Sequence, residues 1–158
     1  MNFFKRKKTA ETPSEAGDGQ QSAAPSKGPV RDERKARRFF EHAAAMAETR
    51  NYDYAIELYI RGLSHNPDAM DRHHALHEVA LKRKIAGGKP AGFKEKMALG
   101  LKDPIEKMLH AEMLWAKEPL SLPRMIAVMQ KAVEADSVVV DFNLAEVAYW
   151  VGELILDR

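Results

Sequence analysis

The amino-acid sequence predicts an all-α fold made of short helices joined in hairpins, and three observations support this prediction. From Asp32 onward, apolar side chains recur three or four positions apart, a spacing that places them on one face of a helix. Proline and glycine residues interrupt the chain between these runs. No stretch alternates strictly between apolar and polar residues, and the one strand-like run, Val138–Val140, is too short to form a strand by itself.

The first predicted hairpin consists of two helices. Residues 36–49 are strong helix formers without glycine or proline, and their apolar side chains form one stripe. A break at residues 50–51 separates them from a second helix, which begins at Tyr52. Pro67 ends this second helix, because proline cannot continue a helix and disfavours helical backbone in the residue before it.

Further helices are predicted after Pro67. One covers residues 69–84, and a glycine- and proline-rich segment separates it from a short helix near residues 93–99. Asp103 and Pro104, followed by Glu106, form a favourable helix start: an acidic N-cap, proline at the first helical position and an acid in the first turn. This helix is expected to end near residue 117, and the last two helices are expected over residues 121–136 and 138–158.

Composition indicates one folded domain, residues 32–158, behind a disordered tail, residues 1–31. The tail is rich in Ser, Pro, Gly, Ala and Gln and cannot bury enough apolar surface to offset its chain entropy. Lys plus Arg number 25 and Asp plus Glu number 23, so the net charge of +2 does not by itself indicate nucleic acid or membrane as a partner. The absence of cysteine excludes disulfides and cysteine-ligated zinc. No apolar run approaches the ~20 residues of a membrane span, and a cytoplasmic location is expected.

The basic residues near the N-terminus define the alternative function. Lys5–Lys8 follow two phenylalanines, and Arg31–Arg38 add further positive charge. Together they would bind a nucleic acid or a membrane surface, with an affinity that falls steeply with salt. A short basic cluster adds little affinity, so a solvated, mobile tail is the preferred interpretation.

The first hairpin combines large and small residues in a characteristic order. Small side chains let two helices approach closely, and aromatic side chains fill the space on either side. These positions resemble the tetratricopeptide repeat, a helix-turn-helix unit of about 34 residues. The chain departs from the family at two positions, where His42 stands in place of leucine and Met46 in place of an aromatic residue. The matching residues are Phe39, Ala43, Tyr52, Ala55, Tyr59, Gly62 and Pro67.

Predicted helix starts recur at this period. Met70 lies 34 positions after Ala36, and Pro104 lies 34 positions after Met70. The second repeat is degenerate, because the sequence GGKPAG disturbs its second helix. The resemblance covers about residues 36–152. It implies a right-handed solenoid of about three repeats and a non-catalytic scaffold or adaptor that binds a partner segment in a concave helical groove.

The resemblance also indicates which residues line the groove. They belong to the first helix of the first and second repeats: Arg37, Phe40, Ala44, Ala47, Glu48, Asp71, His74, Glu78, Leu81 and Lys82. Phe40 directly follows Phe39, and adjacent helical residues point in different directions, so both are not expected to fill one core. Phe40 is therefore either an exposed anchor for a peptide or a residue that packs under the N-terminal extension; the sequence leaves both open.

Residues 71–78 read DRHHALHE and raise the question of a metal site. His73 and His77 are four positions apart and share a helix face, as two metal ligands do. The HExxH zinc motif is absent, however, because His74 follows His73 where the motif needs Glu, and no third ligand follows at an evident spacing. The repeat register assigns His73 and His77 to packing positions instead. We therefore expect no metal, no cofactor and no catalytic residue, and a metal-dependent enzyme is the least favoured class.

The C-terminal segment ends in an apolar helix face that includes Leu154, Ile155 and Leu156. A solenoid needs a terminal unit with a polar outer face. Three alternatives remain open: the helix caps the last repeat, further chain packs on it, or two copies associate through this open end to form a homo-oligomer.

Overall fold

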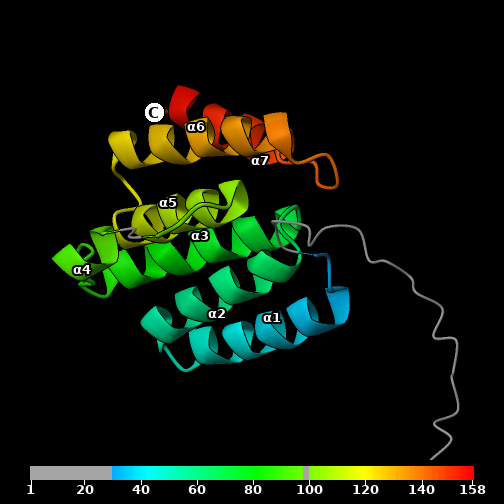
Figure 1. Cartoon of the computed structure of the whole chain (residues 1–158). Coiled ribbons are helices and arrows are strands. Elements are labelled where there is room, and N and C mark those ends of the chain that lie inside the picture. Colours follow the sequence, from blue (N-terminus) through cyan, green and yellow to red (C-terminus); the bar gives the residue numbers. More distant parts are fainter. Residues whose placement is uncertain (1–29, 98–99) are drawn as a thin grey trace, which may run out of the picture.

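The computed structural model describes residues 30–97 and 100–158, which contain helices and no strand. The prediction of an all-α fold is therefore confirmed for this part of the chain (Figure 1). The helices are α1 (Glu33–Glu48), α2 (Tyr52–His65), α3 (Met70–Ile85), α4 (Phe93–Lys96), α5 (Pro104–Lys117), α6 (Leu122–Val138) and α7 (Ala145–Leu156).

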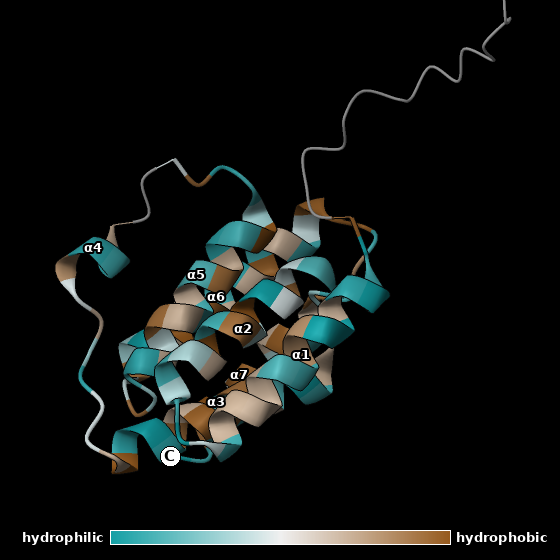
Figure 2. Cartoon of the chain, turned by 90° about the horizontal axis from the view of Figure 1, so that it is seen from below, coloured by the Kyte–Doolittle hydropathy of each residue, from teal (hydrophilic) through white to brown (hydrophobic). Residues whose placement is uncertain are grey.

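The long helices form a stack of pairs in two layers. Helices α1 and α2 pack together at one end of the stack, α3 and α5 lie in the middle, and α6 and α7 form the other end (Figure 1). Seen from below, α2, α5 and α6 lie on one side and α1, α3 and α7 on the other (Figure 2). Helix α5 contacts α2, α3 and α6, so it lies between the two end pairs of the stack.

Two predicted helix starts agree with the structure because the sequence supplies their caps. The Asp103 carboxylate accepts the N–H groups of Ile105 and Glu106, at 2.8 and 3.0 Å, and Pro104 occupies the first turn of α5. The Ser121 hydroxyl oxygen accepts the N–H of Arg124 at the start of α6. These contacts satisfy amide donors that have no partner within the helix.

The start of the last helix was predicted wrongly. Residues 139–144 connect α6 to α7, and α7 begins at Ala145 instead of near Val138. Asp136 explains the delay, because its Oδ1 atom accepts the N–H groups of Leu144 and Ala145, at 3.1 and 3.0 Å. This carboxylate near the end of α6 therefore caps the following helix, and α6 itself extends past Asp136 to Val138.

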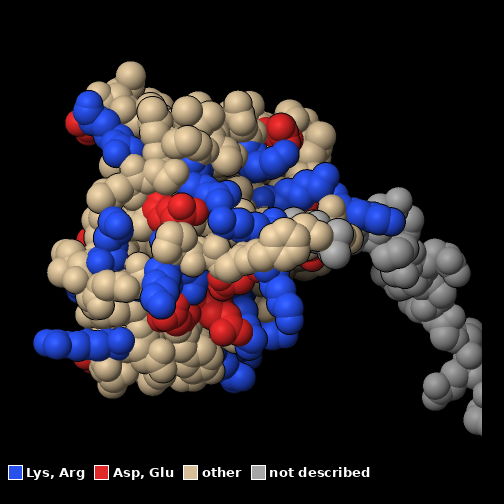
Figure 3. All heavy atoms as spheres, turned by 90° about the vertical axis from the view of Figure 1, so that its left-hand side faces the viewer, with Lys and Arg blue, Asp and Glu red and all other residues tan. Residues whose placement is uncertain are grey.

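The segment between α3 and α5 is attached to the stack by Arg83. This buried guanidinium donates to the Asp53 carboxylate on α2 and to the backbone carbonyl of Lys89, at 2.8 and 2.7 Å. The short helix expected near residues 93–99 is the single turn α4, and residues 98–99 lie outside the described residues. Acidic and basic side chains intermingle over the lower and middle part of this side of the molecule (Figure 3).

Candidate functional site

Residues 71–78 lie in the first half of α3 and divide between its two faces. Asp71, His74 and Glu78 are exposed, and Lys82 extends the same face by another turn. We call these four residues the α3 stripe. His73 is fully buried and His77 is half-buried, as the packing positions assigned to them from the sequence require. The three histidines therefore belong to different environments and do not form one polar cluster.

His73 forms a buried ion pair with Glu112 of α5. Its Nδ1 atom lies 2.6 Å from Glu112 Oε1, and its Nε2 atom lies 2.7 Å from the carbonyl oxygen of Pro67. When Glu112 is ionised both partners are acceptors, and a neutral imidazole has only one N–H, so it is the imidazolium that satisfies both hydrogen bonds. Burial alone would lower the pKa of His73, but the charge of Glu112 and the two hydrogen bonds raise it above its ordinary value.

The second oxygen of the Glu112 carboxylate has no hydrogen-bond partner among residues 30–97 and 100–158. Glu112 is only 1% exposed, so its charge depends on the imidazolium for compensation. His77 lies nearby, and burial lowers its pKa, although the negative charge of Glu112 opposes this shift. The site thus contains one buried His–Glu ion pair. His77 lies beside it, and its lowered pKa favours the neutral form of its ring.

Two tryptophans pack against the histidines of α3. Trp115 of α5 stacks on His77 with ring centroids 4.7 Å apart, and its indole N–H donates to the carbonyl of Pro119. Trp150 of α7 lies 4.7 Å from His74 and 5.6 Å from Trp115, between ring centroids. Trp115 is buried and Trp150 is only half-buried. Trp150 therefore brings an aromatic surface next to the exposed α3 stripe.

The arrangement offers no evident catalytic chemistry. A histidine held by a carboxylate resembles the base of a catalytic triad. His73 differs, because it is 0% exposed and its Nε2 atom is already bound to the Pro67 carbonyl, so it cannot reach a substrate. Across residues 30–97 and 100–158, no three His, Cys, Asp or Glu side chains are arranged to hold a metal ion.

Of the two alternatives that the sequence leaves open for Phe40, the exposed anchor is contradicted by the structure. Phe40 is 3% exposed and packs in the core between α1 and α2, whereas Phe39 is half-buried and stacks on His65 at 5.7 Å. Gly62 explains the difference, because a Cβ atom added there would lie 2.6 Å from Cδ1 of Phe40. The space left by this glycine is thus filled by the Phe40 ring, which Tyr59 also contacts.

The other groove residues of α1 have different exposures. Arg37 and Glu48 are exposed, whereas Ala44 and Ala47 are half-buried, as is Leu81 on α3. Arg37 and Asp71 come together, because both line a hollow of about 250 Å³ between α1 and the start of α3. Phe40 lies in the wall of this hollow, under the guanidinium of Arg72.

Arg31, assigned to the tail from the sequence, is attached to the folded part. Its guanidinium makes two hydrogen bonds of 2.9 Å to the Asp68 carboxylate and lies 4.9 Å from the centre of the Phe142 ring. Arg31 is therefore not a free cation for the alternative basic surface. The tail up to residue 29, including Lys5–Lys8, lies outside the described residues.

The α6/α7 end of the stack exposes apolar side chains. Val133, Tyr149 and Leu156 are 55%, 69% and 85% exposed, whereas Leu154 and Ile155 pack partly against the Trp115 cluster. The upper end of the molecule in Figure 3, over α6 and α7, is mostly uncharged. Self-association through this end stays a prediction.

The sequence prediction missed Glu112, Trp115 and Trp150. One signal was available for Glu112: it follows Met108 by four positions and precedes Trp115 by three, so a charged residue lies within an apolar stripe. A charge at a core position indicates a buried partner, although it does not say which residue that is. The signal for Trp150 was weaker, because α7 is apolar on several sides.

No protein-family model, curated protein or solved structure matches this chain. In the part that the structure describes, no helix combines the length and the apolar character needed to cross a membrane. The class of the molecule is therefore defined by its fold and site: an all-helical stack with an exposed charged stripe beside a tryptophan.

Proposed function

We propose that this chain is a non-catalytic protein-interaction module, a scaffold or adaptor that binds a segment of a partner protein. The observation that carries the proposal is the contact between the α3 stripe and Trp150, where His74 packs on a half-buried indole ring. Tryptophan is one of the residues that most often dominate the binding energy of protein interfaces.

The chemistry of this face suits a peptide. The α3 stripe presents two acids, a histidine and a lysine on successive turns of one helix. The hollow beside it, which Asp71 also lines, adds the positive charge of Arg37. A partner segment would place an apolar side chain against Trp150 and pair its polar groups with the stripe. The helices are already formed, so binding needs little rearrangement.

The packing of the first hairpin supports the resemblance to tetratricopeptide repeats. Ala43 and Ala55 are 0% exposed between α1 and α2, and Gly62 admits an aromatic ring from the facing helix. On this proposal α1 and α2 form the first repeat and α3 begins a degenerate second repeat. Helix α5, whose start at Pro104 the sequence period assigns to a third repeat, closes the second repeat instead, because α4 is only one turn. The chain would then be a short solenoid with the α3 stripe on its groove side.

The proposal is tested by affinity capture from the native cell lysate with mass spectrometry. The test variant is His74→Ala/Glu78→Ala/Lys82→Ala, which removes exposed side chains and leaves the net charge of the acidic and basic residues unchanged. The matched control is Glu57→Ala/Arg61→Ala, an exposed ion pair on α2. Circular dichroism verifies that all three proteins are equally helical.

We expect at least one protein to be captured by the wild type and by the control, and to be lost from the test variant. Capture of the same proteins by all three would place the interaction elsewhere and contradict the proposal. Capture dominated by nucleic acid or lipid, and abolished by salt, would favour the basic alternative.

A further inference from the structure

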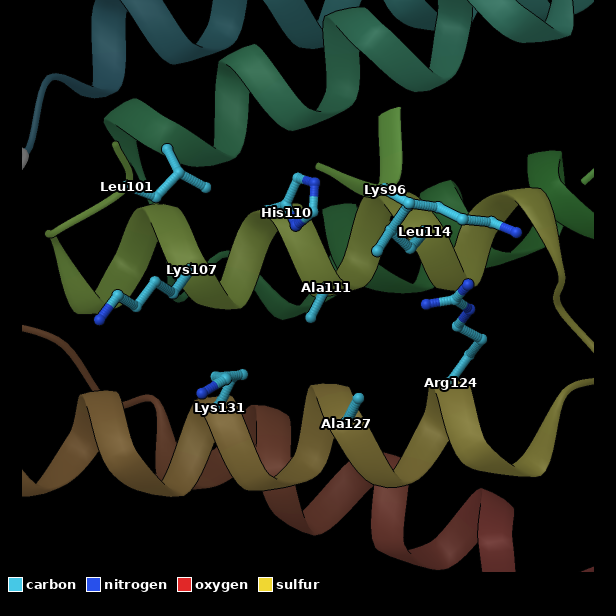
Figure 4. A pocket seen from close by; sticks show the side chains of 9 residues that line it. All are labelled: Lys96, Leu101, Lys107, His110, Ala111, Leu114, Arg124, Ala127 and Lys131. Atoms are coloured by element: carbon cyan, nitrogen blue, oxygen red, sulfur yellow. The ribbon is translucent and has the colours of Figure 1, made fainter. Parts of the chain in front are cut away.

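A second hollow, of about 360 Å³, lies between α5 and α6, on the opposite layer from the α3 stripe. Its floor is formed by small and apolar side chains, among them Ala111 and Leu114 of α5 and Ala127 of α6 (Figure 4). The two alanines face each other across the pair of helices, so the space between the helices is left open. We call this space the α5/α6 hollow.

The rim of the α5/α6 hollow is basic. Lys107 of α5 and Lys131 of α6 lie at one end of it, and Lys96 and Arg124 lie at the other (Figure 4). None of the described residues that line the hollow is acidic. Like charges converge there from three segments of the chain, and an anion between them would relieve their repulsion.

Nearby carboxylates neutralise only two of the four cations on this rim. Arg124 pairs with Glu118 and Lys131 pairs with Glu134, both at 3.0 Å. Within residues 30–97 and 100–158, neither Lys96 nor Lys107 has an ion-pair partner. The hollow therefore keeps a net positive charge at both of its ends.

His110 fixes the position of one of these cations. Its Nε2 atom lies 2.7 Å from the carbonyl oxygen of Glu95, and it donates a hydrogen bond to that oxygen. Lys117 of α5 also lies 3.8 Å from the Glu95 carboxylate. Both contacts hold the α4 turn against α5, so the adjacent Lys96 side chain reaches the end of the hollow opposite Lys107 (Figure 4).

We propose that the α5/α6 hollow binds an acidic peptide segment through two carboxylates, with an apolar side chain between them over the alanine floor. Arg124 and Lys131 are about two helical turns apart, or roughly 10 Å along α6. A polyproline II segment rises about 3.1 Å per residue with three residues per turn, so acids three positions apart point the same way with this separation. The site is separate from the α3 stripe and does not rest on the function proposed for it.

The proposal is tested by selecting random short peptides, displayed on phage, against the immobilised full chain. The test variant is Lys107→Gln/Lys131→Gln, which removes the cations at one end of the hollow. The control is Lys84→Gln/Lys89→Gln, which removes two exposed lysines that do not line it. A selected peptide is then synthesised, and its affinity for each protein is measured by fluorescence anisotropy.

We expect the wild type and the control to enrich peptides with acids three positions apart and an apolar residue between them. The test variant should bind the selected peptide about tenfold more weakly, which corresponds to the loss of two partly exposed charge contacts. No enrichment of acids, or equal binding by the test variant, would overturn the proposal. Inorganic phosphate that competes as strongly as the peptide would make the hollow a small-anion site and overturn the peptide assignment.

Discussion

The substitution Glu112→Gln should reverse the pH dependence of stability. In the wild type, the pKa of His73 is higher in the folded protein than in the unfolded chain. The stabilising contribution of the protonated His73 ring is therefore complete below the unfolded pKa of about 6.5, and it is lost as the pH rises through the folded pKa. In the variant, a neutral His73 can donate from Nε2 to Pro67 and accept at Nδ1 from the new amide.

Without the carboxylate, burial lowers the folded pKa of His73 below that of the unfolded chain. The stability of the variant is then complete above about pH 6.5 and is lost as the pH falls below this value. The pKa of His77, which burial already lowers, loses the opposing effect of Glu112 and changes in the same direction.

The size of the effect follows from one proton. A difference of one bound proton between the unfolded and folded states changes the free energy of unfolding by about 1.4 kcal/mol per pH unit. Above about pH 6.5 the unfolding free energy of the wild type falls with rising pH at this rate. Below about pH 6.5 the unfolding free energy of the variant rises with pH at the same rate. The difference in unfolding free energy between the two proteins should therefore change by about 2–3 kcal/mol over two pH units centred near 6.5.

The assay is urea unfolding followed by circular dichroism at several pH values, with linear extrapolation to water. Glu106→Gln is the matched control, because it makes the same chemical change at an exposed position of α5. Its curve should stay parallel to that of the wild type. Parallel curves for Glu112→Gln as well would refute the reasoning, because they would mean that His73 does not carry a proton in the folded protein. The nitrogen chemical shifts of the His73 ring, measured by NMR, report the protonation state of this residue directly.

Two further predictions concern packing and the N-terminal attachment. Gly62→Ala should destabilise the domain by about 1–2 kcal/mol, because the added methyl group overlaps the Phe40 ring and overpacking outweighs the gain in helix propensity. Gly152→Ala, where a Cβ meets only ordinary contacts, should be neutral or stabilising in the same urea unfolding assay, and equal losses would contradict this account. Arg31→Ala should cost about 1 kcal/mol or less, measured by urea unfolding, with a loss that shrinks in high salt. It should also raise the pKa of Asp68, which the hydrogen bond from Arg31 lowers against the effect of burial; an unchanged carboxyl titration by NMR would rule this out.

Local chemistry determined which features could be predicted from the sequence. The start of α5 was predicted correctly, because Asp103 and Pro104 act within a few residues of their own position. The start of α7 was not, because it depends on Asp136, whose side chain reaches nine positions along the chain to Ala145. Capping within one turn is visible in a sequence, whereas capping across a loop depends on the path of that loop.

The choice between Phe39 and Phe40 shows a second limit. Helical periodicity predicts that one of two adjacent aromatic residues faces the core, but it fixes the direction of that face only to within about one residue. The decision depends on the facing helix, where Gly62 leaves space at the position that Phe40 reaches. The glycine was noted as a close-packing position, yet its partner could not be assigned without the relative placement of α1 and α2.

The same limit applies to the candidate site. His73 was assigned to a packing position, and it is buried. Its partner Glu112 lies 39 positions further along the chain, and nothing in the local pattern of either helix identifies the other. Trp150 is more distant still, on a helix whose start was misplaced. Residues that a fold brings together from three helices are not marked by any spacing in the sequence.

The buried ion pair of His73 and Glu112 affects how α5 is placed on α3. Helix α5 is connected to α3 through a segment that contains only the single turn α4, so no helical hairpin sets the register of α5 on α3. The pair joins α3 to α5, and the second hydrogen bond of His73 adds Pro67 in the turn between α2 and α3. A buried charge pair contributes little net stability but is costly in any other register, where both charges would be uncompensated. We therefore interpret the pair as the device that fixes the register of α5. If so, hydrogen exchange in Glu112→Gln at low pH should accelerate first in α3 and α5, whereas uniform acceleration across all helices would contradict this interpretation.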